Sequence, residues 1–228
     1  RKAIAESCDD FFYKGSLKLG INKISQTLGK LGFGESTGID QINEFVGANP
    51  NKEWKEKKYK EPWYVGETVI TSIGQGNMLV TPLQIARYTG YLATGKLPKP
   101  HFYKANYEEP KELDIPSKYL DIMRKGMYDV SYSPKGTANK HINSKITIAS
   151  KTGTAQVVSI PQSEKVRMKE SELQYYQRSH AWITTYGPFE NPQYAVTVIE
   201  EHGGHGGEAA GDITSKIYDK LLELGYIK

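Results

Sequence analysis

Apolar residues in the first part of the chain recur at the spacing of helices. The segment from Ile4 to Leu19 is predicted to be mostly helical, and a second helix is predicted from Ile21 to Leu31, ending at the glycine-containing residues 32–34. Residues 47–66 are polar and rich in Lys, Glu and Pro, which predicts a long surface loop. Within that loop, the charged residues from Lys52 to Lys60 are predicted to face solvent.

The clearest helix start is the sequence Thr81-Pro82-Leu83-Gln84. A threonine N-cap, a proline at the first helical position and a glutamine three residues after the threonine form a capping box. This helix is predicted to run to about Thr94 and to end at Gly95. A further helix is predicted from Ser117 to about Tyr128.

The pattern changes to that of strands in the last third of the chain. Residues 145–158 are rich in β-branched side chains, and two more strands are predicted at residues 181–186 and 194–199. The stretch between the last two, residues 187–192, contains Gly, Asn and two Pro residues, which favour a turn. These two strands are therefore predicted to form an antiparallel hairpin.

The chain ends in a predicted amphipathic helix whose apolar positions are four residues apart: Ala209, Ile213, Ile217 and Leu221. Helices followed by an antiparallel sheet and then by a helix that packs back on the sheet are typical of the α+β class. The predicted architecture is therefore an antiparallel sheet flanked by helices.

Composition and charge narrow the possible functions. The chain has 228 residues, 38% of them hydrophobic and 11% aromatic, which favours a folded domain with a hydrophobic core over a disordered chain. The formal net charge of +4 is small and its cations are dispersed, so nucleic acid is not a predicted partner. The single cysteine, Cys8, excludes an intrachain disulfide and a cysteine-based metal cluster, and it is predicted to be a small buried side chain.

The start of the sequence is unlike a natural N-terminus, because Arg1 lies within an amphipathic segment. No apolar run approaches the roughly 18 residues of a membrane span, and no secretory signal is visible. We interpret residue 1 as the edge of a longer chain, so these absences say nothing about location.

The strongest candidates for a functional site are the residues Lys151-Thr152-Gly153-Thr154. Taken alone, they are compatible with an ordinary edge strand. However, a glycine inside a strand often marks the close approach of a ligand, and an unpaired strand edge can bind an extended peptide as an added strand. The ammonium group of Lys151 and the two threonine hydroxyls would then form a cradle for a terminal carboxylate.

The order of motifs resembles that of the class B penicillin-binding proteins. Residues 149–157 are similar to the strand of that family that carries its K-T-G motif, and Ser7-Cys8-Asp9 occupies the place of its S-x-N motif, with aspartate instead of asparagine. Residues 74–86, His180-Ala181-Trp182 and the glycine-rich residues 202–207 also match. The resemblance covers essentially the whole chain.

The third motif of that family, S-x-x-K, is absent, because no serine of this sequence is followed by lysine three positions later. The resemblance implies that this motif precedes S-x-N by several tens of residues. It further implies that residues 1–228 are the C-terminal part of a single transpeptidase domain with the penicillin-binding (serine β-lactamase-like) fold, incomplete at its N-terminus. The nucleophilic serine, an N-terminal domain and a membrane anchor are expected upstream of residue 1.

The resemblance also implies roles for individual residues in a serine D,D-transpeptidase. Ser7 would relay a proton and Lys151 would keep the site positive, whereas Asp9 would pair with a lysine or brace the site loop. Thr152, Gly153 and Thr154 would bind the substrate. The implied substrates are peptidoglycan stem peptides ending in D-Ala-D-Ala, and β-lactams would acylate the enzyme.

The resemblance further implies a role in cell elongation and rod-shape maintenance, with a glycan polymerase and a rod-shape scaffold protein as partners. It implies no cofactor and no metal. The implied location is the inner membrane, with the catalytic domain in the periplasm. A D,D-carboxypeptidase, a β-lactamase, and a non-catalytic β-lactam sensor or assembly module remain alternatives.

His202 and His205 have acidic neighbours, but the glycines between them favour a flexible loop over a metal site.

Overall fold

The computed structural model describes residues 1–158 and 170–228. These residues form two compact units. The sheet unit consists of residues 1–6 and 124–228, and the helical unit consists of residues 7–123. Helix α7 (Ser117–Tyr132) runs from the helical unit into the sheet unit, and it is four residues longer than the predicted helix at its C-terminal end.

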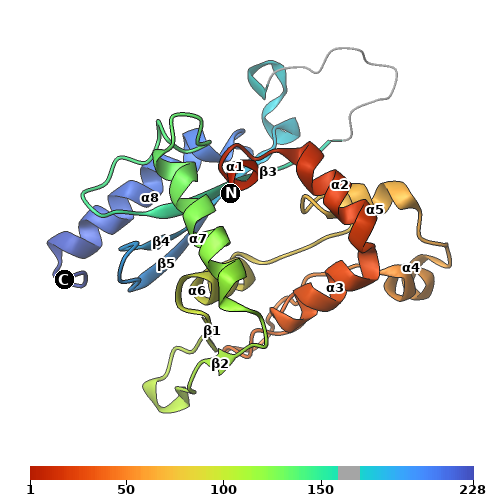
Figure 1. The fold of residues 1–228 in the computed structure, drawn as a ribbon, viewed down its shortest axis with the longest axis horizontal. Helices are drawn as coiled ribbons and strands as arrows, with labels where there is room; N and C mark the ends of the chain where they lie inside the picture. Colours follow the sequence, from red (N-terminus) through yellow and green to blue (C-terminus); the bar gives the residue numbers. More distant parts are fainter. Residues whose placement is uncertain (159–169) are drawn as a thin grey trace. The chain divides into compact units, whose positions relative to one another are not determined.

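The sheet unit is built on a three-stranded antiparallel sheet with the order β3-β4-β5 (Figure 1). The strands are β3 (Ala149–Ala155), β4 (His180–Gly187) and β5 (Tyr194–Glu200). The predicted hairpin of β4 and β5 is confirmed, whereas β3 is shorter than the predicted strand at 145–158. Cross-strand pairs of β-branched residues stabilise such a sheet, and here the hydroxyl groups of Thr184 and Thr197 lie 2.8 Å apart.

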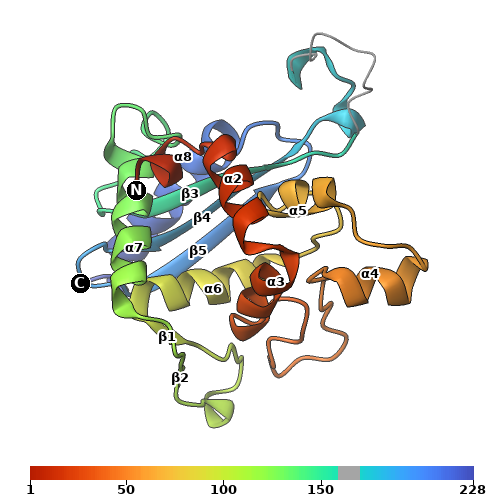
Figure 2. The ribbon, with the colours of Figure 1, turned by 45° about the vertical axis from the view of Figure 1, so that its right-hand side comes forward.

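Helix α8 (Gly206–Glu223) packs on this sheet (Figure 2), but through a different face from the predicted one. Ile213, a member of the predicted apolar stripe, is 40% exposed. The buried face consists mostly of small side chains: Gly206, Gly207, Ala210, Gly211, Thr214, Ser215 and Tyr218. Small residues allow the helix backbone to approach the strands closely. The close packing of α8 on the sheet, rather than the hydrophobic pattern of its sequence, therefore determines which face of the helix is buried.

Tyr218 connects α8 to both strands of the hairpin. Its hydroxyl donates to the carbonyl oxygen of Tyr194 at 3.2 Å and accepts from the hydroxyl of Thr185, also at 3.2 Å. Burial raises the pKa of Tyr218, so the phenol remains protonated and keeps its role as a donor. A large buried side chain with a satisfied hydroxyl group therefore anchors the middle of the helix.

The N-terminal residues contribute the short helix α1 (Lys2–Ala5) to the sheet unit. Ile4 is buried against the backbone of α7 at Gly126, where a Cβ would lie 2.9 Å from the Ile4 side chain. The guanidinium group of Arg1 forms an ion pair with Asp129. The prediction that the segment from Ile4 to Leu19 is mostly helical is confirmed, with a break between α1 and the next helix where Ser7 adopts a left-handed backbone conformation with φ of 48°.

The helical unit contains most of the remaining elements. They are α2 (Asp9–Leu19), α3 (Ile21–Lys30), α4 (Lys52–Tyr59), α5 (Val65–Thr71), α6 (Pro82–Thr94), the two-residue strands β1 (Lys96–Leu97) and β2 (Lys111–Glu112), and the 3-10 turn η1 (Lys104–Asn106). The predicted start of α6 is confirmed, since Thr81 Oγ1 accepts from the Gln84 amide at 3.1 Å and Gln84 Oε1 accepts from the Thr81 amide at 3.0 Å. Gly95 ends the helix in the left-handed conformation.

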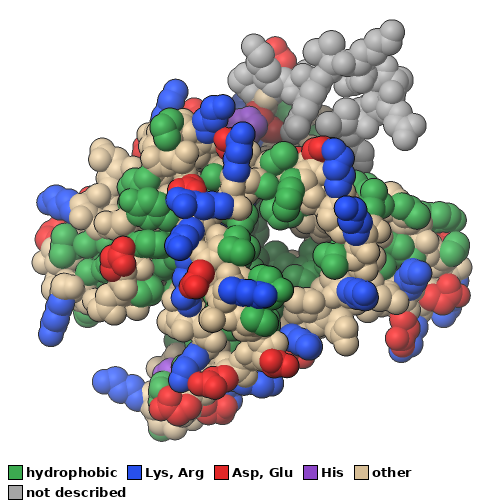
Figure 3. All heavy atoms as spheres, in the orientation of Figure 1, with side chains coloured by type: hydrophobic (Ala, Val, Ile, Leu, Met, Phe, Trp, Pro, Cys, Tyr) green, Lys and Arg blue, Asp and Glu red, His purple; other side chains and the backbone are tan. Residues whose placement is uncertain are grey.

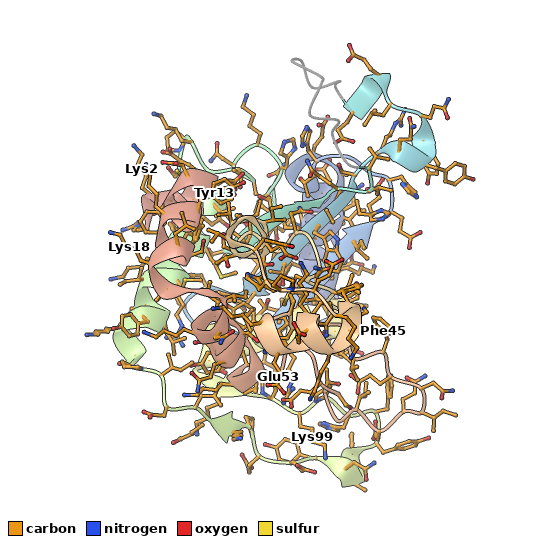
Figure 4. The ribbon with its side chains drawn as sticks, turned by 90° about the vertical axis from the view of Figure 1, so that its right-hand side faces the viewer. Lys2, Tyr13, Lys18, Phe45, Glu53 and Lys99 are labelled. Carbon is orange, nitrogen blue, oxygen red and sulfur yellow. The ribbon has the colours of Figure 1, made fainter. Side chains whose placement is uncertain are left out.

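The prediction of a long loop at residues 47–66 was wrong, because this region contains α4. Asn51 caps the helix by accepting a hydrogen bond from the Trp54 amide at 2.9 Å. Most side chains of α4 are exposed, including Glu53, which is labelled in Figure 4. Lys55 is the exception: it is buried, with its ammonium nitrogen 2.8 Å from the Glu67 carboxylate at the start of α5. A helix with one buried cation leaves no hydrophobic pattern in the sequence.

Charged side chains are distributed over the face of the molecule shown in Figure 3, where Lys and Arg residues do not gather into one patch. This agrees with the small net charge of +4. Within residues 1–158 and 170–228, no helix combines the length and the apolar composition that crossing a bilayer requires.

Candidate functional site

The candidate site lies on β3, one of the two outer strands of the sheet in the described part of the chain. In the described part of the chain, β3 pairs with β4 along one edge, with Lys151 opposite Thr184 and Gly153 opposite Trp182. The residues from Lys151 to Ala155 are half-buried, whereas Ala149 and Ser150 before them are buried. The strand therefore begins in the core, and its motif lies at the half-buried edge of the sheet, where an extended peptide can pair with the strand.

Side chains of β3 alternate between the two faces of the sheet, so Ser150, Thr152 and Thr154 share one face. The Ser150 hydroxyl lies 2.8 Å from the hydroxyl of Ser131 on α7. The Thr152 hydroxyl lies 2.7 Å from that of Thr137, which follows α7. Both contacts join residues 15 or more positions apart, and they hold this face of the strand against the end of α7 and the turn after it.

The other face of β3 carries Lys151 and Gly153. The Lys151 ammonium group donates to the carbonyl oxygen of Thr152 at 2.9 Å, which keeps the positive charge close to the strand. At Gly153, a Cβ would lie 3.3 Å from the Cβ of Trp182. The glycine therefore permits the tight pairing of β3 with β4 beside the motif.

The first turn of α8 also contacts the motif. A Cβ at residue 206 would lie 2.2 Å from the carbonyl oxygen of Gly153 and 2.1 Å from that of Trp182. A Cβ at residue 207 would lie 2.5 Å from the carbonyl oxygen of Thr137 and 3.5 Å from the methyl carbon of Thr152. The glycine-rich residues that matched in sequence thus bring the start of a helix against the backbone of the site strand.

The buried serine pair gives a stability prediction. Ser131 and Ser150 are 1% and 0% exposed, so their hydroxyl groups depend on each other for hydrogen bonding. Ser150→Ala leaves the Ser131 hydroxyl without this partner, and we expect it to lower the free energy of unfolding by about 1–3 kcal/mol. Chemical denaturation of both single variants and the double variant measures this. The double variant should lose less than the sum of the two single losses, and strict additivity would contradict the coupling.

Of the predicted site residues, Ser7, Cys8 and Asp9 belong to the helical unit, and the residues from Lys151 to Thr154 belong to the sheet unit. Ser7 is half-buried and has a positive φ, a strained conformation for a residue with a side chain. Asp9 is exposed in the first turn of α2, where a carboxylate interacts favourably with the helix N-terminus. The prediction that Cys8 is buried was wrong: it is exposed at the N-cap of α2.

The sequence favoured a flexible loop after β5, but His202 in this loop makes several contacts. The His202 amide donates to Nδ1 of His180 at 3.0 Å, and the two imidazole rings have centroids 4.7 Å apart. The ring of Tyr175 lies 5.1 Å from that of His202. Among the described residues, no group of three or more His, Cys, Asp or Glu side chains is arranged to hold a metal ion. Residues 161–178, whose length and charge between two predicted strands favour a mobile loop or a partner surface, lie partly outside the described residues.

Comparison with known proteins gives consistent matches. The chain matches the family described as penicillin binding protein transpeptidase domain over residues 1–223. It is 36% identical, over 234 residues, to the peptidoglycan D,D-transpeptidase MrdA of Escherichia coli strain K12, and the match covers 97% of this chain. It covers only 36% of that relative, so the chain spans about a third of its length.

Two solved structures are similar over almost the whole chain. The complex between penicillin-binding protein 2 and MreC from Helicobacter pylori has a TM-score of 0.90 and 47% sequence identity, covering 99% of this chain and 40% of that one. A peptidoglycan synthase complex described as coordinating polymerization and crosslinking has a TM-score of 0.75 and 30% identity, covering 99% of this chain and 37% of that one. The predicted fold, an α+β penicillin-binding transpeptidase fold, is confirmed, and the chain belongs to the penicillin-binding protein transpeptidase domain family.

Proposed function

We propose that the protein containing these residues is a peptidoglycan D,D-transpeptidase that cross-links stem peptides during cell elongation and rod-shape maintenance. The observation that carries the proposal is the outer strand β3, whose half-buried Lys-Thr-Gly-Thr sequence lies at a sheet edge and is supported from behind by α7 and α8. The name of the E. coli relative, a peptidoglycan D,D-transpeptidase, supports the same activity.

The donor stem peptide binds as an added strand along β3, with its backbone amides and carbonyls paired to those of the strand. The hydroxyl groups of Thr152 and Thr154 donate to the terminal D-Ala carboxylate, and the Lys151 ammonium group keeps this region positive. Gly153, which lies between the two threonines, has no side chain that could obstruct the peptide. The Thr154 amide acts as one oxyanion donor for the tetrahedral intermediate, and the amide of the nucleophilic serine acts as the other.

The nucleophile is a serine of an S-x-x-K segment upstream of residue 1, in a longer chain that also has an N-terminal domain and a membrane anchor. Its oxygen attacks the carbonyl carbon between the two D-alanines while the lysine of that segment accepts the hydroxyl proton. The C–N bond breaks and the terminal D-Ala leaves as an amine that receives a proton, relayed by Ser7. An acceptor amine then attacks the carbonyl carbon of the acyl ester, so that a new amide C–N bond forms and the ester C–O bond breaks. The proton that the amine loses returns to the serine oxygen.

Asp9 can only accept hydrogen bonds while it is ionised, so it serves this site by pairing with a cation or by bracing the loop that carries Ser7. A β-lactam is attacked in the same way and leaves a slowly hydrolysed acyl-enzyme.

The proposed partners are a glycan polymerase and a rod-shape scaffold protein. The solved complex of penicillin-binding protein 2 with MreC and the synthase complex that coordinates polymerization with crosslinking support this proposal by similarity. The proposed location is the inner membrane, with the catalytic domain in the periplasm.

The full-length protein should be labelled covalently by a fluorescent penicillin, and replacement of the upstream serine by alanine should abolish the label. Given a stem pentapeptide and an added acceptor amine, it should release D-Ala and form the cross-linked product, which mass spectrometry detects. Release of a tetrapeptide alone would identify a carboxypeptidase, and rapid turnover of penicillin would identify a β-lactamase. Stable labelling without any peptide product would favour a non-catalytic sensor. The isolated 228-residue chain should show no labelling.

A further inference from the structure

We propose that Thr137 is a positioning residue that orients the hydroxyl proton of Thr152 toward the carboxylate of the bound substrate. This inference rests on the proposed function, because it concerns the same site. Its starting point is the contact of 2.7 Å between the hydroxyl oxygens of Thr137 and Thr152, which lie 15 residues apart in sequence. This is a normal distance for an O–H···O hydrogen bond.

The backbone around Thr137 is held on several sides. Its amide donates to the carbonyl oxygen of Ala5 in α1 at 3.2 Å, and the next amide, that of Ala138, donates to the carbonyl oxygen of Val130 at 3.0 Å. Ala138 is fully buried. The carbonyl oxygen of Thr137 lies so close to α8 that only a glycine fits at residue 207. Thr137 therefore presents its hydroxyl from a fixed turn, and the hydroxyl pair is a consequence of backbone packing.

The direction of the hydrogen bond follows from the chemistry of the ligand. Each hydroxyl group has one proton to donate, and a carboxylate can only accept. If Thr152 donates to a substrate carboxylate, the proton between the two hydroxyl oxygens must come from Thr137. Donation from Thr137 also polarises the Thr152 hydroxyl and strengthens the bond that Thr152 makes to the anion. With the opposite direction, a lone pair of Thr152 would face the carboxylate.

A purely structural role for the hydroxyl pair makes a different prediction. In that case the loss of the Thr137 hydroxyl would disturb the turn and slow acylation by every ligand to the same degree. In the positioning role, the loss affects only ligands with a carboxylate to recognise. The ratio of the rates for two ligands that differ only in this group therefore separates the two roles.

The experiment measures the second-order rate constant of acylation of the full-length protein by benzylpenicillin and by its methyl ester. Thr137→Val keeps the branched shape but removes the hydroxyl, and we expect about a 10-fold lower rate with benzylpenicillin, the upper end of the net effect of one hydrogen bond between neutral groups. The rate with the ester should remain within about 2-fold of the wild type. Thr137→Ser retains the hydroxyl and should restore most of the rate with benzylpenicillin.

Thr152→Val provides the matched variant of the partner residue. If Thr137 acts through Thr152, adding Thr137→Val to Thr152→Val should cause almost no further loss, because coupled residues are not additive. Thermal unfolding of each variant checks the fold, and Thr137→Ala removes the same hydroxyl if the valine variant does not fold.

An equal loss with both ligands, or an unchanged rate with benzylpenicillin, would overturn the positioning role while leaving the proposed function standing. A wild-type protein that neither ligand acylates would overturn the proposed function and this inference together.

Discussion

Replacing Lys151 by alanine in the full-length protein is expected to lower the rate of acylation by penicillin by about 100-fold or more. The Lys151 ammonium group lies against the strand, 2.9 Å from the carbonyl oxygen of Thr152, at the place where the proposed substrate carboxylate and oxyanion are bound. Its removal takes away the positive charge that favours both anions. Stopped-flow or gel-based labelling with a fluorescent penicillin measures the loss directly.

Lys145→Ala is a matched control for this prediction. Lys145 lies in the same unit and its side chain is exposed four residues before β3 begins, so its loss should change the acylation rate by less than 2-fold. Circular dichroism and thermal unfolding should show that both variants retain the fold. Normal acylation of a folded Lys151→Ala variant would remove Lys151 from its proposed role.

The substitution Gly206→Ala is expected to cause the largest loss of stability. The added methyl group would lie 2.1 Å from the carbonyl oxygen of Trp182 and 2.2 Å from that of Gly153. Both atoms belong to the backbone of the sheet, so rotation of a side chain cannot relieve the overlap. We expect a loss of about 3 kcal/mol in the free energy of unfolding, at the upper end for overpacked sites. Chemical denaturation measures the change.

The control for this second prediction is Gly15→Ala, within helix α2. A Cβ at this position meets no atom within 4 Å, and alanine is a better helix former than glycine. This variant should therefore be neutral or more stable by up to about 1 kcal/mol. If Gly206→Ala were as stable as the wild type, α8 would not pack against β3 and β4 as described.

Elements with local signals were predicted well. The start and end of α6 follow from Thr81, Gln84 and Gly95, whose side chains or backbone conformation act within one turn of the helix. The hairpin of β4 and β5 was found because the two β-branched runs flank a turn sequence. Helix α4 was missed for the opposite reason. It buries Lys55 in place of an apolar stripe, and its partner Glu67 is 12 residues away.

The site shows the same division. The strand carrying Lys151 to Thr154 was recognised from its own residues, since the motif is contiguous. The support of its hydroxyl face by Ser131 was not predicted, because a serine outside a motif has no distinctive pattern. The face of α8 was predicted wrongly, since its contact surface is selected by the close approach of backbones at Gly206 and Gly211 rather than by the position of Ile213.

The sequence by itself determined the family, the α+β class, the order of most elements and the strand that carries the candidate site. These features depend on residues that are close together in the chain. Only the tertiary structure decided that β3 lies at an edge of the sheet, that Thr137 contacts Thr152, and that glycines at 206 and 207 bring α8 against the motif. Such contacts join distant segments and depend on distances of a few tenths of an ångström, which packing of the folded chain sets.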